Sequence, residues 1–114
     1  MAENVVYLNY TEGVKRVMNN TKLYVKLLTK FKDGTNLDNL AAALAAGDME
    51  KAQAEAHTIK GVAANLSLSE LFNQSLELEN QIKAGTVNPD QMETVTTVFN
   101  TTLLEVEKVI AENG

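Results

Sequence analysis

The chain has no cysteine, and its 114 residues include one proline and one histidine. Without cysteine there are no disulfides and no thiolate chemistry, and one histidine is too few for the usual zinc sites, so we expect no bound metal. The net charge of -5 argues against a general nucleic-acid binder, because such proteins need a basic surface. No apolar run approaches the ~20 residues of a membrane span, and the first residues do not resemble a secretion signal. We therefore expect a cytoplasmic protein with no nucleic-acid or membrane partner.

Length and hydrophobic content indicate one domain. A chain of 114 residues that is 45% hydrophobic can form one compact core but not two, so residues 1–114 are expected to be a single unit. Apolar residues recur at helical spacing almost throughout, with short turns between the segments. Short connections place neighbouring helices antiparallel. The sequence predicts an all-α protein, an up-and-down antiparallel four-helix bundle with additional short N-terminal helices.

Several helix boundaries carry a specific signal. Ser67, with Glu70 three residues later, has the spacing of a capping box and predicts a helix that closes near Gly85. The last helix should begin at Pro89, with Gln91 two residues further on. The side chains expected to cap helices are those of Thr11, Asp48, Ser67 and Asn88, and a possible short helix precedes Thr11.

The only histidine, His57, lies away from the apolar stripe of its helix. At 100° per residue, His57, Gly61 and Ala64 point away from that stripe. Gly61 lowers the stability of the helix by about 1 kcal/mol relative to alanine, so its presence needs an explanation other than helix formation. One such explanation is that glycine leaves space beside the imidazole. The stripe itself consists of Met49, Ala52, Ala56, Ile59, Ala63 and Leu66.

A carboxylate is expected opposite this histidine. Helical rise places His57 and Glu79 at about the same distance, roughly 15 to 18 Å, from the turn at Ser67. Glu79 falls within an apolar stripe, where a charge needs a partner, and a donor from the imidazole would satisfy it. If Glu79 accepts from Nδ1, then Nε2 keeps an outward lone pair and becomes an oriented nucleophile. Lys60 and Lys83 could converge on the same opening and attract an anion.

Each feature also has an ordinary structural interpretation. A single histidine on a protein surface is usually a polar residue without a specific function. Glu79 could reach solvent from the edge of its stripe, and lysines usually serve as solvated surface charges. Gly61 could permit close helix packing, although its direction opposite the core argues against this. The coincidence of four features on one patch favours a functional site.

The run from Ala56 to Leu66 resembles the signature of histidine-containing phosphotransfer (HPt) domains, helical bundles of multistep two-component phosphorelays. The likeness extends over nearly the whole chain, with one departure at Ser67, where many members have glycine. The resemblance implies that His57 is the phosphorylated residue and that Glu79 is bonded to it. It further implies that Lys60 is the adjacent basic residue, that Gly61 gives access, and that Lys83 matches a position that is basic in some members.

The resemblance implies a phosphorelay carrier. His57 would accept a phosphoryl group from the phosphoaspartate of a receiver domain and pass it to another receiver, with charge compensation by Lys60 and Lys83. The expected partners are response-regulator receiver domains and a sensor or hybrid histidine kinase, and we expect a monomer without a cofactor. Docking should use the face around His57, with Gln53, Gly61 and Ala64 as candidates. No nucleotide-binding motif is present, so autonomous kinase activity is not expected.

Two other classes remain open at this point. One is a structural or adaptor bundle that binds a signalling protein without carrying phosphate. The other is an enzyme with His57 as general base, for which no second catalytic group beyond Glu79 is evident. A test for acid-labile phosphate would separate the carrier from both.

Overall fold

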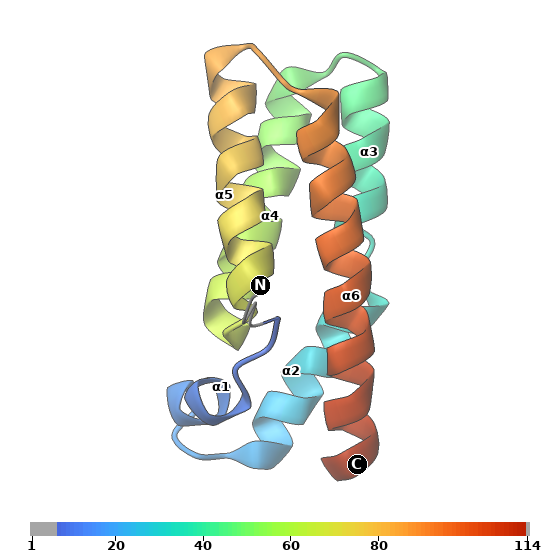
Figure 1. Cartoon of the computed structure of the whole chain (residues 1–114). Coiled ribbons are helices and arrows are strands. Elements are labelled where there is room, and N and C mark those ends of the chain that lie inside the picture. Colours follow the sequence, from blue (N-terminus) through green and yellow to red (C-terminus); the bar gives the residue numbers. More distant parts are fainter. Residues whose placement is uncertain (1–6, 114) are drawn as a thin grey trace, which may run out of the picture.

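A computed structural model describes residues 7–113, and the all-α prediction is confirmed there (Figure 1). Residues 7–9 are not helical, and the rest of the segment expected to form a helix before Thr11 lies outside the described residues. None of the described helices is both long and apolar enough to cross a membrane. The helices are α1 (Tyr10–Arg16), α2 (Thr21–Asp33), α3 (Asn36–Ala45), α4 (Met49–Leu66), α5 (Ser69–Ala84) and α6 (Pro89–Asn113).

The long helices lie side by side. From α3 to α6 the direction alternates along the chain, and α4 packs between α3 and α5 (Figure 1). The longest helix, α6, packs against α5 over one part of its length and against α2 over another. The short α1 lies at the end of the molecule where α4 turns into α5, and it contacts α4 and α2 (Figure 1).

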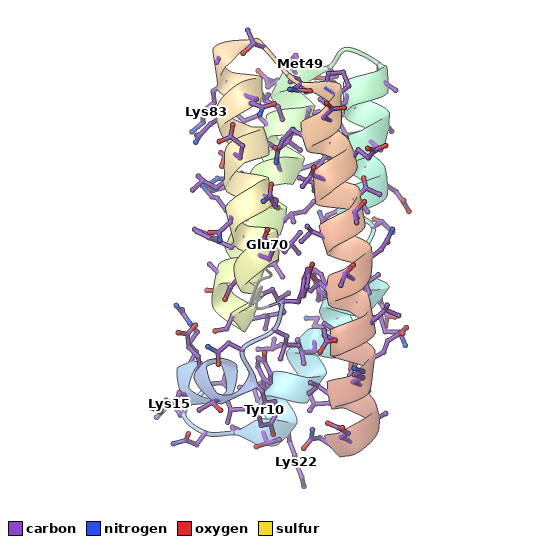
Figure 2. All side chains as sticks on the ribbon, in the orientation of Figure 1. Tyr10, Lys15, Lys22, Met49, Glu70 and Lys83 are labelled. Carbon is purple, nitrogen blue, oxygen red and sulfur yellow. The ribbon has the colours of Figure 1, made fainter. Side chains whose placement is uncertain are left out.

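The core is made by the apolar stripes of these helices. From α4, the side chains of Ala52, Ala56, Ile59, Ala63 and Leu66 are buried, as the periodicity predicted. Met49 is the exception at 40% exposed, because it is the first residue of α4 and lies at the end of the bundle (Figure 2). The remaining buried apolar residues come mainly from α2, α5 and α6 and include Tyr24, Leu28, Leu71, Leu78, Val95 and Val106.

Two expected caps are confirmed and a third is wrong. Asp48 accepts a hydrogen bond from the Lys51 backbone N–H at 3.1 Å, and Asn88 accepts one from Asp90 at 2.9 Å. The expected cap at Thr11 is wrong, because α1 begins at Tyr10 and its cap is Asn9. The Asn9 side chain accepts from the Glu12 backbone N–H at 3.1 Å, so the helix starts earlier than the threonine suggested.

Ser67 does not open α5 as the capping-box spacing predicted. It ends α4 in the left-handed region, at φ 58°, and α5 begins at Ser69. The Ser67 hydroxyl is buried and donates instead to a Glu12 carboxylate oxygen at 2.8 Å. The Ser67 side chain therefore bonds to a residue of α1, which is distant in the sequence, and not to the first turn of α5 as the local pattern predicted.

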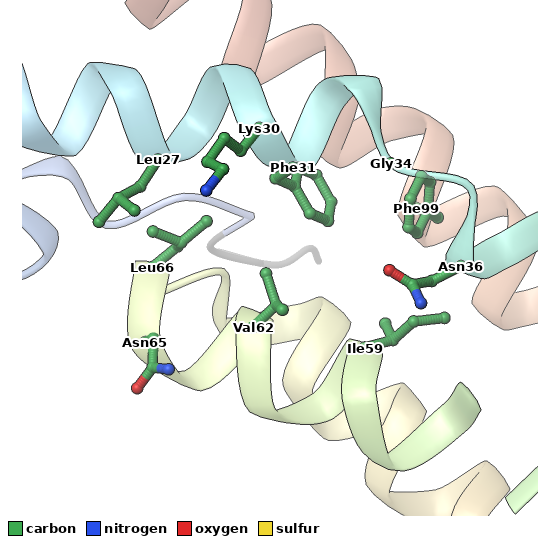
Figure 3. Close-up of a pocket in the computed structure, with 10 residues that line it drawn as sticks. All are labelled: Leu27, Lys30, Phe31, Gly34, Asn36, Ile59, Val62, Asn65, Leu66 and Phe99. Atoms are coloured by element: carbon green, nitrogen blue, oxygen red, sulfur yellow. The ribbon is translucent and has the colours of Figure 1, made fainter. Parts of the chain in front are cut away.

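One side of α4 is loosely packed. A cavity of about 290 Å³ separates it from α2, and Figure 3 shows apolar side chains of both helices facing the space. Ile59, Val62 and Leu66 of α4 line it, and at helical spacing these point opposite to His57. The cavity is therefore not part of the surface around the histidine.

Candidate functional site

Helix α4 presents His57 to solvent. The side chains of its neighbours Ala56 and Ile59 are buried in the core, whereas the His57 side chain is 67% exposed. Gly61 is also exposed and Ala64 is half-buried, so the predicted division of the helix into a core face and an open face is present. The division follows from the spacing of the apolar residues, which can be buried only on one side.

Glu79 lies beside this histidine in the interface between α4 and α5. Its side chain is 2% exposed, in line with the buried Ser75, Leu78 and Ile82 of the same helix. Glu79 Oε2 lies 3.1 Å from His57 Nδ1, which is the contact that helical rise predicted. An ionised carboxylate can only accept, so Nδ1 carries the proton and Nε2 of the neutral ring has the free lone pair.

Two lysines also reach this carboxylate. Lys60 Nζ lies 2.8 Å from Oε1, and Lys83 Nζ lies 3.7 Å from Oε2. The sequence predicted that both lysines would reach the opening, but it did not show that both would contact Glu79. The apolar periodicity of a helix does not predict these two contacts, because a long lysine side chain outside the apolar stripe can still bend toward a buried charge.

The cations keep Glu79 ionised. Burial by itself raises the pKa of the Glu79 carboxyl, but the contacts from Lys60 and His57 and the charge of Lys83 outweigh it. The net effect holds that pKa below its ordinary value of 4.5. Two lysines around one carboxylate leave one positive charge in excess, before any protonation of the ring. This excess belongs to the cluster of Glu79 with its two lysines, since Glu50 adds a negative charge elsewhere in the lining of the hollow around His57.

A shallow hollow surrounds the imidazole. Of the residues proposed for docking, Gln53 lies in it one turn before His57, and Gly61 and Ala64 follow on the same open face of α4. The complete lining is Glu50, Gln53, Ala54, His57, Thr58, Glu79 and Lys83. Glu50, Ala54 and Thr58 were not among the predicted site residues. Positions seven and three residues before a helical residue share its face, so spacing alone would have found Glu50 and Ala54.

Gly61 is not required by the packing of the protein itself. A Cβ added at this position would meet no atom within 4 Å. Its φ is also helical, so the backbone does not need glycine there. The space beside His57 therefore opens to the outside. Among residues 7–113, no three His, Cys, Asp or Glu side chains gather closely enough to hold a metal ion.

Comparison with known protein families assigns the chain to one of them. The family model described as Hpt domain matches residues 27–111, which include α3, α4, α5 and nearly all of α6. The chain belongs to the Hpt domain family. Hpt domains are phosphotransfer carriers of two-component signalling that interact with receiver domains and histidine kinases. No curated protein and no solved structure matches the chain. The match begins within α2, so α1 lies outside it.

Proposed function

We propose that this protein carries a phosphoryl group on Nε2 of His57. It accepts the group from the phosphoaspartate of one receiver domain and passes it to the aspartate of another. The observation that carries this proposal is the contact between His57 Nδ1 and the buried Glu79 carboxylate at 3.1 Å, with the rest of the ring exposed. A phosphoryl carrier needs an imidazole whose orientation is fixed and whose second nitrogen is accessible to the phosphoryl donor.

The transfer step uses the lone pair of Nε2. This nitrogen attacks the phosphorus in line, the N–P bond forms, and the bond from phosphorus to the aspartyl oxygen breaks. The aspartate leaves as a carboxylate. The ring then carries the phosphoryl group on Nε2 and a proton on Nδ1, so it is positively charged. Glu79 stabilises that charge through the hydrogen bond it already accepts, and no group has to reorient during the step.

Lys60 and Lys83 compensate the negative charge of the incoming phosphoryl group. Lys83 is the more mobile candidate, because its side chain is 53% exposed and its contact with Glu79 is long at 3.7 Å. Lys60 is 21% exposed and closer to Glu79, at 2.8 Å. We assign Lys83 the direct approach to phosphate and Lys60 the shorter-range role of keeping Glu79 charged and in place.

The receiver docks on the open face of α4. Gly61 and Ala64 add no side chain larger than a methyl group on the same side as His57, so a receiver surface can approach the ring closely there. Gln53 lines the hollow beside the ring and can hydrogen-bond to that surface. A transient contact of modest area suits a carrier that must release each partner. No part of this chain has to draw phosphate from ATP, since the receiver supplies the activated phosphoryl group.

The test is phosphotransfer from labelled receivers. Each receiver domain of the source organism is phosphorylated and incubated with the wild-type protein and with His57→Gln. We expect acid-labile, base-stable phosphate on the wild type and none on the variant. Helical content should be unchanged, because the His57 side chain is mostly outside the core. The chain has one histidine, so phosphohistidine can form at one position only.

Two results would contradict the proposal. Stable phosphate on His57→Gln would place the acceptor elsewhere. Binding of receivers to the wild type with no transfer from any of them would identify an adaptor bundle instead.

A further inference from the structure

Helix α1 lies outside the residues matched by the family model and near the open face of α4. It precedes residue 27, where the family match begins. Figure 1 places it at the end of the bundle where α4 turns into α5. In Figure 2, Lys15 of α1 and Lys83 of the histidine site project toward the same side of the view. The question is whether α1 only closes the fold or also faces the partner.

The position of α1 is fixed by buried contacts. The Asn9 backbone N–H donates to the Ser67 carbonyl at 3.0 Å, and the Ser67 hydroxyl donates to Glu12 at 2.8 Å. Gly13 packs so closely on the Tyr24 ring that a Cβ there would come within 2.4 Å of it. These contacts hold α1 against the end of α4, so its outward side chains have a defined place relative to the α4 surface.

A hollow lies between α1 and the α4–α5 pair. Its α4 residues are Ala63 and Ala64, and Phe72 of α5 adds an aromatic wall. Arg16 and Glu12 of α1 form the opposite side, and Ser67, Ser69 and Asn73 complete the lining. Its volume is about 300 Å³, and it is open to solvent. A hollow of this kind has room for one large apolar side chain of a partner.

The hollow is continuous with the histidine surface. At 100° per residue His57, Gly61 and Ala64 lie on one line of α4, and Ala64 also lines the hollow. Seven residues at 1.5 Å each separate His57 from Ala64, so the hollow begins about 10 Å along the helix from the reacting nitrogen. A receiver that reaches His57 therefore also covers this hollow, because a modest protein interface is wider than this distance.

Arg16 gives the hollow its charge preference. Its guanidinium Nε lies 4.0 Å from a Glu12 carboxylate oxygen, and the side chain is half exposed. The terminal nitrogens of a guanidinium can bind a carboxylate in a forked arrangement. An exposed pair at this distance contributes little to stability, so Arg16 can exchange Glu12 for a partner group.

We infer that α1 builds a second docking subsite for receiver domains, which selects among them. The subsite takes an apolar side chain of the receiver against Ala64 and Phe72, with a receiver carboxylate on Arg16. This inference rests on the proposed function, since the partner is the same receiver that exchanges phosphate with His57. It assigns to α1 a role in choosing the partner rather than in the chemistry, because none of its side chains is near the ring.

The test separates docking from chemistry. Transfer rates from each phosphorylated receiver are measured against receiver concentration for the wild type, Arg16→Glu and Asn73→Trp. Asn73 is exposed at the edge of the hollow, so a tryptophan there would obstruct it without entering the core. We expect both variants to raise KM at least about tenfold for the receivers that use the subsite, with kcat within about twofold of wild type, because an interaction made before the chemistry affects binding alone. Lys26→Glu makes the same charge change on an exposed position of α2 and should leave KM unchanged.

A small donor provides the second arm. Phosphoramidate can phosphorylate an imidazole directly, because its P–N bond breaks, the Nε2–P bond forms and ammonia leaves. It needs no docking surface, so both variants should react with it at the wild-type rate. A wild type that takes phosphate from neither receivers nor phosphoramidate would overturn the proposed function. A wild type that transfers normally, with variants that keep its KM for every receiver, would overturn the α1 subsite alone. Loss of kcat in both variants would show that α1 acts on the chemistry instead and would also overturn it.

Discussion

Two glycines in the middle of helices, Gly13 and Gly61, have opposite surroundings. At Gly13 an added Cβ would lie 2.4 Å from the Tyr24 ring, whereas at Gly61 it would meet nothing within 4 Å. Both have helical φ, and each costs its helix about 1 kcal/mol relative to alanine. The protein itself explains the first glycine, because close contact with Tyr24 holds α1 in place. It does not explain the second, which therefore points to a requirement imposed from outside.

The same contrast separates two buried ionisable groups. The Tyr24 hydroxyl donates to the Leu66 carbonyl at 2.7 Å inside the core, and burial raises the pKa of Tyr24 to about 12. Glu79 is equally buried, but lysines and an exposed histidine contact it, and its pKa is lowered. One group is kept neutral to complete the fold. The other is kept charged at the edge of the open surface.

The largest expected effect comes from filling the empty space at Gly61. Gly61→Gln should slow transfer from a phosphorylated receiver by at least about 100-fold, because a displacement of about 1 Å from in-line geometry has an effect of that size. Helical content should be unchanged and stability slightly higher, since glutamine is a better helix former than glycine. Rates measured by quenched-flow labelling test the first part, and urea unfolding tests the second. If this variant transferred phosphate at the wild-type rate, Gly61 would not be needed for access of the receiver to His57, and the proposed difference between the two glycines would be wrong.

Removing the carboxylate should have a smaller effect on the same reaction. Glu79→Ala is expected to slow transfer by roughly 10- to 100-fold without abolishing it, because the ring loses its orientation but keeps its nucleophile. Glu77→Ala is the matched control, since it removes the same charge from an exposed position of α5. Both rates are compared under single-turnover conditions. Equal rates for the two variants would remove Glu79 from the site.

A methyl group at Gly13 should act on the fold. Gly13→Ala is expected to destabilise the protein by about 1 to 3 kcal/mol, which is the usual effect of forcing extra volume into a packed interior. The Tyr24 ring cannot move aside freely, because its hydroxyl donates a hydrogen bond to the Leu66 carbonyl and its ring packs in a T-shaped arrangement with that of Tyr10. Urea unfolding with a fitted midpoint measures the loss. A variant as stable as wild type would show that α1 is not clamped by this contact.

These regions also differ in how far the sequence predicted them. The apolar stripe of α4 placed His57 on the open side, and equal helical rise on either side of a short turn placed Glu79 opposite it. Both inferences depend only on periodicity and on the length of the connection. The structure confirms the contact between them, at 3.1 Å. The chemical roles of these residues remain predictions.

The α1 contacts could not be found in the same way. The hydrogen bond from Ser67 to Glu12 joins residues 55 positions apart, and no local pattern marks it. Ser67 and Glu70 have the spacing of a capping box, but α5 begins at Ser69 and the capping prediction is wrong. Likewise Gly13 has no signal in its own helix, because the reason for it is the Tyr24 ring of another helix. A contact between two single residues that are far apart in the sequence produces no periodic pattern, so sequence periodicity cannot predict it.

A smaller substitution at Gly61 sharpens the contrast further. Gly61→Ala should stabilise the protein by about 1 kcal/mol, the difference in helix propensity, because the added methyl group meets no neighbour. The same change at Gly13 is expected to have the opposite sign. Both variants are measured in parallel by urea unfolding at neutral pH. If Gly61→Ala were destabilising, an internal packing role would replace the interpretation based on access.

The weakest expected effect is a difference in pH dependence between Glu79 and Tyr24. The folded pKa of Glu79 is below its ordinary value of 4.5, so its contribution to stability is present above that pH and is lost as pH falls through the folded value. Tyr24 behaves in the opposite sense. Its folded pKa is about 12, so its contribution is present below pH 10 and is lost as pH rises from 10 toward 12. Glu79→Gln should therefore flatten the acid side of a stability curve, and Tyr24→Phe the alkaline side. Urea unfolding of both variants across pH measures this, and an acid side that stays as steep in Glu79→Gln as in the wild type would contradict the role of the ionised carboxylate in stability.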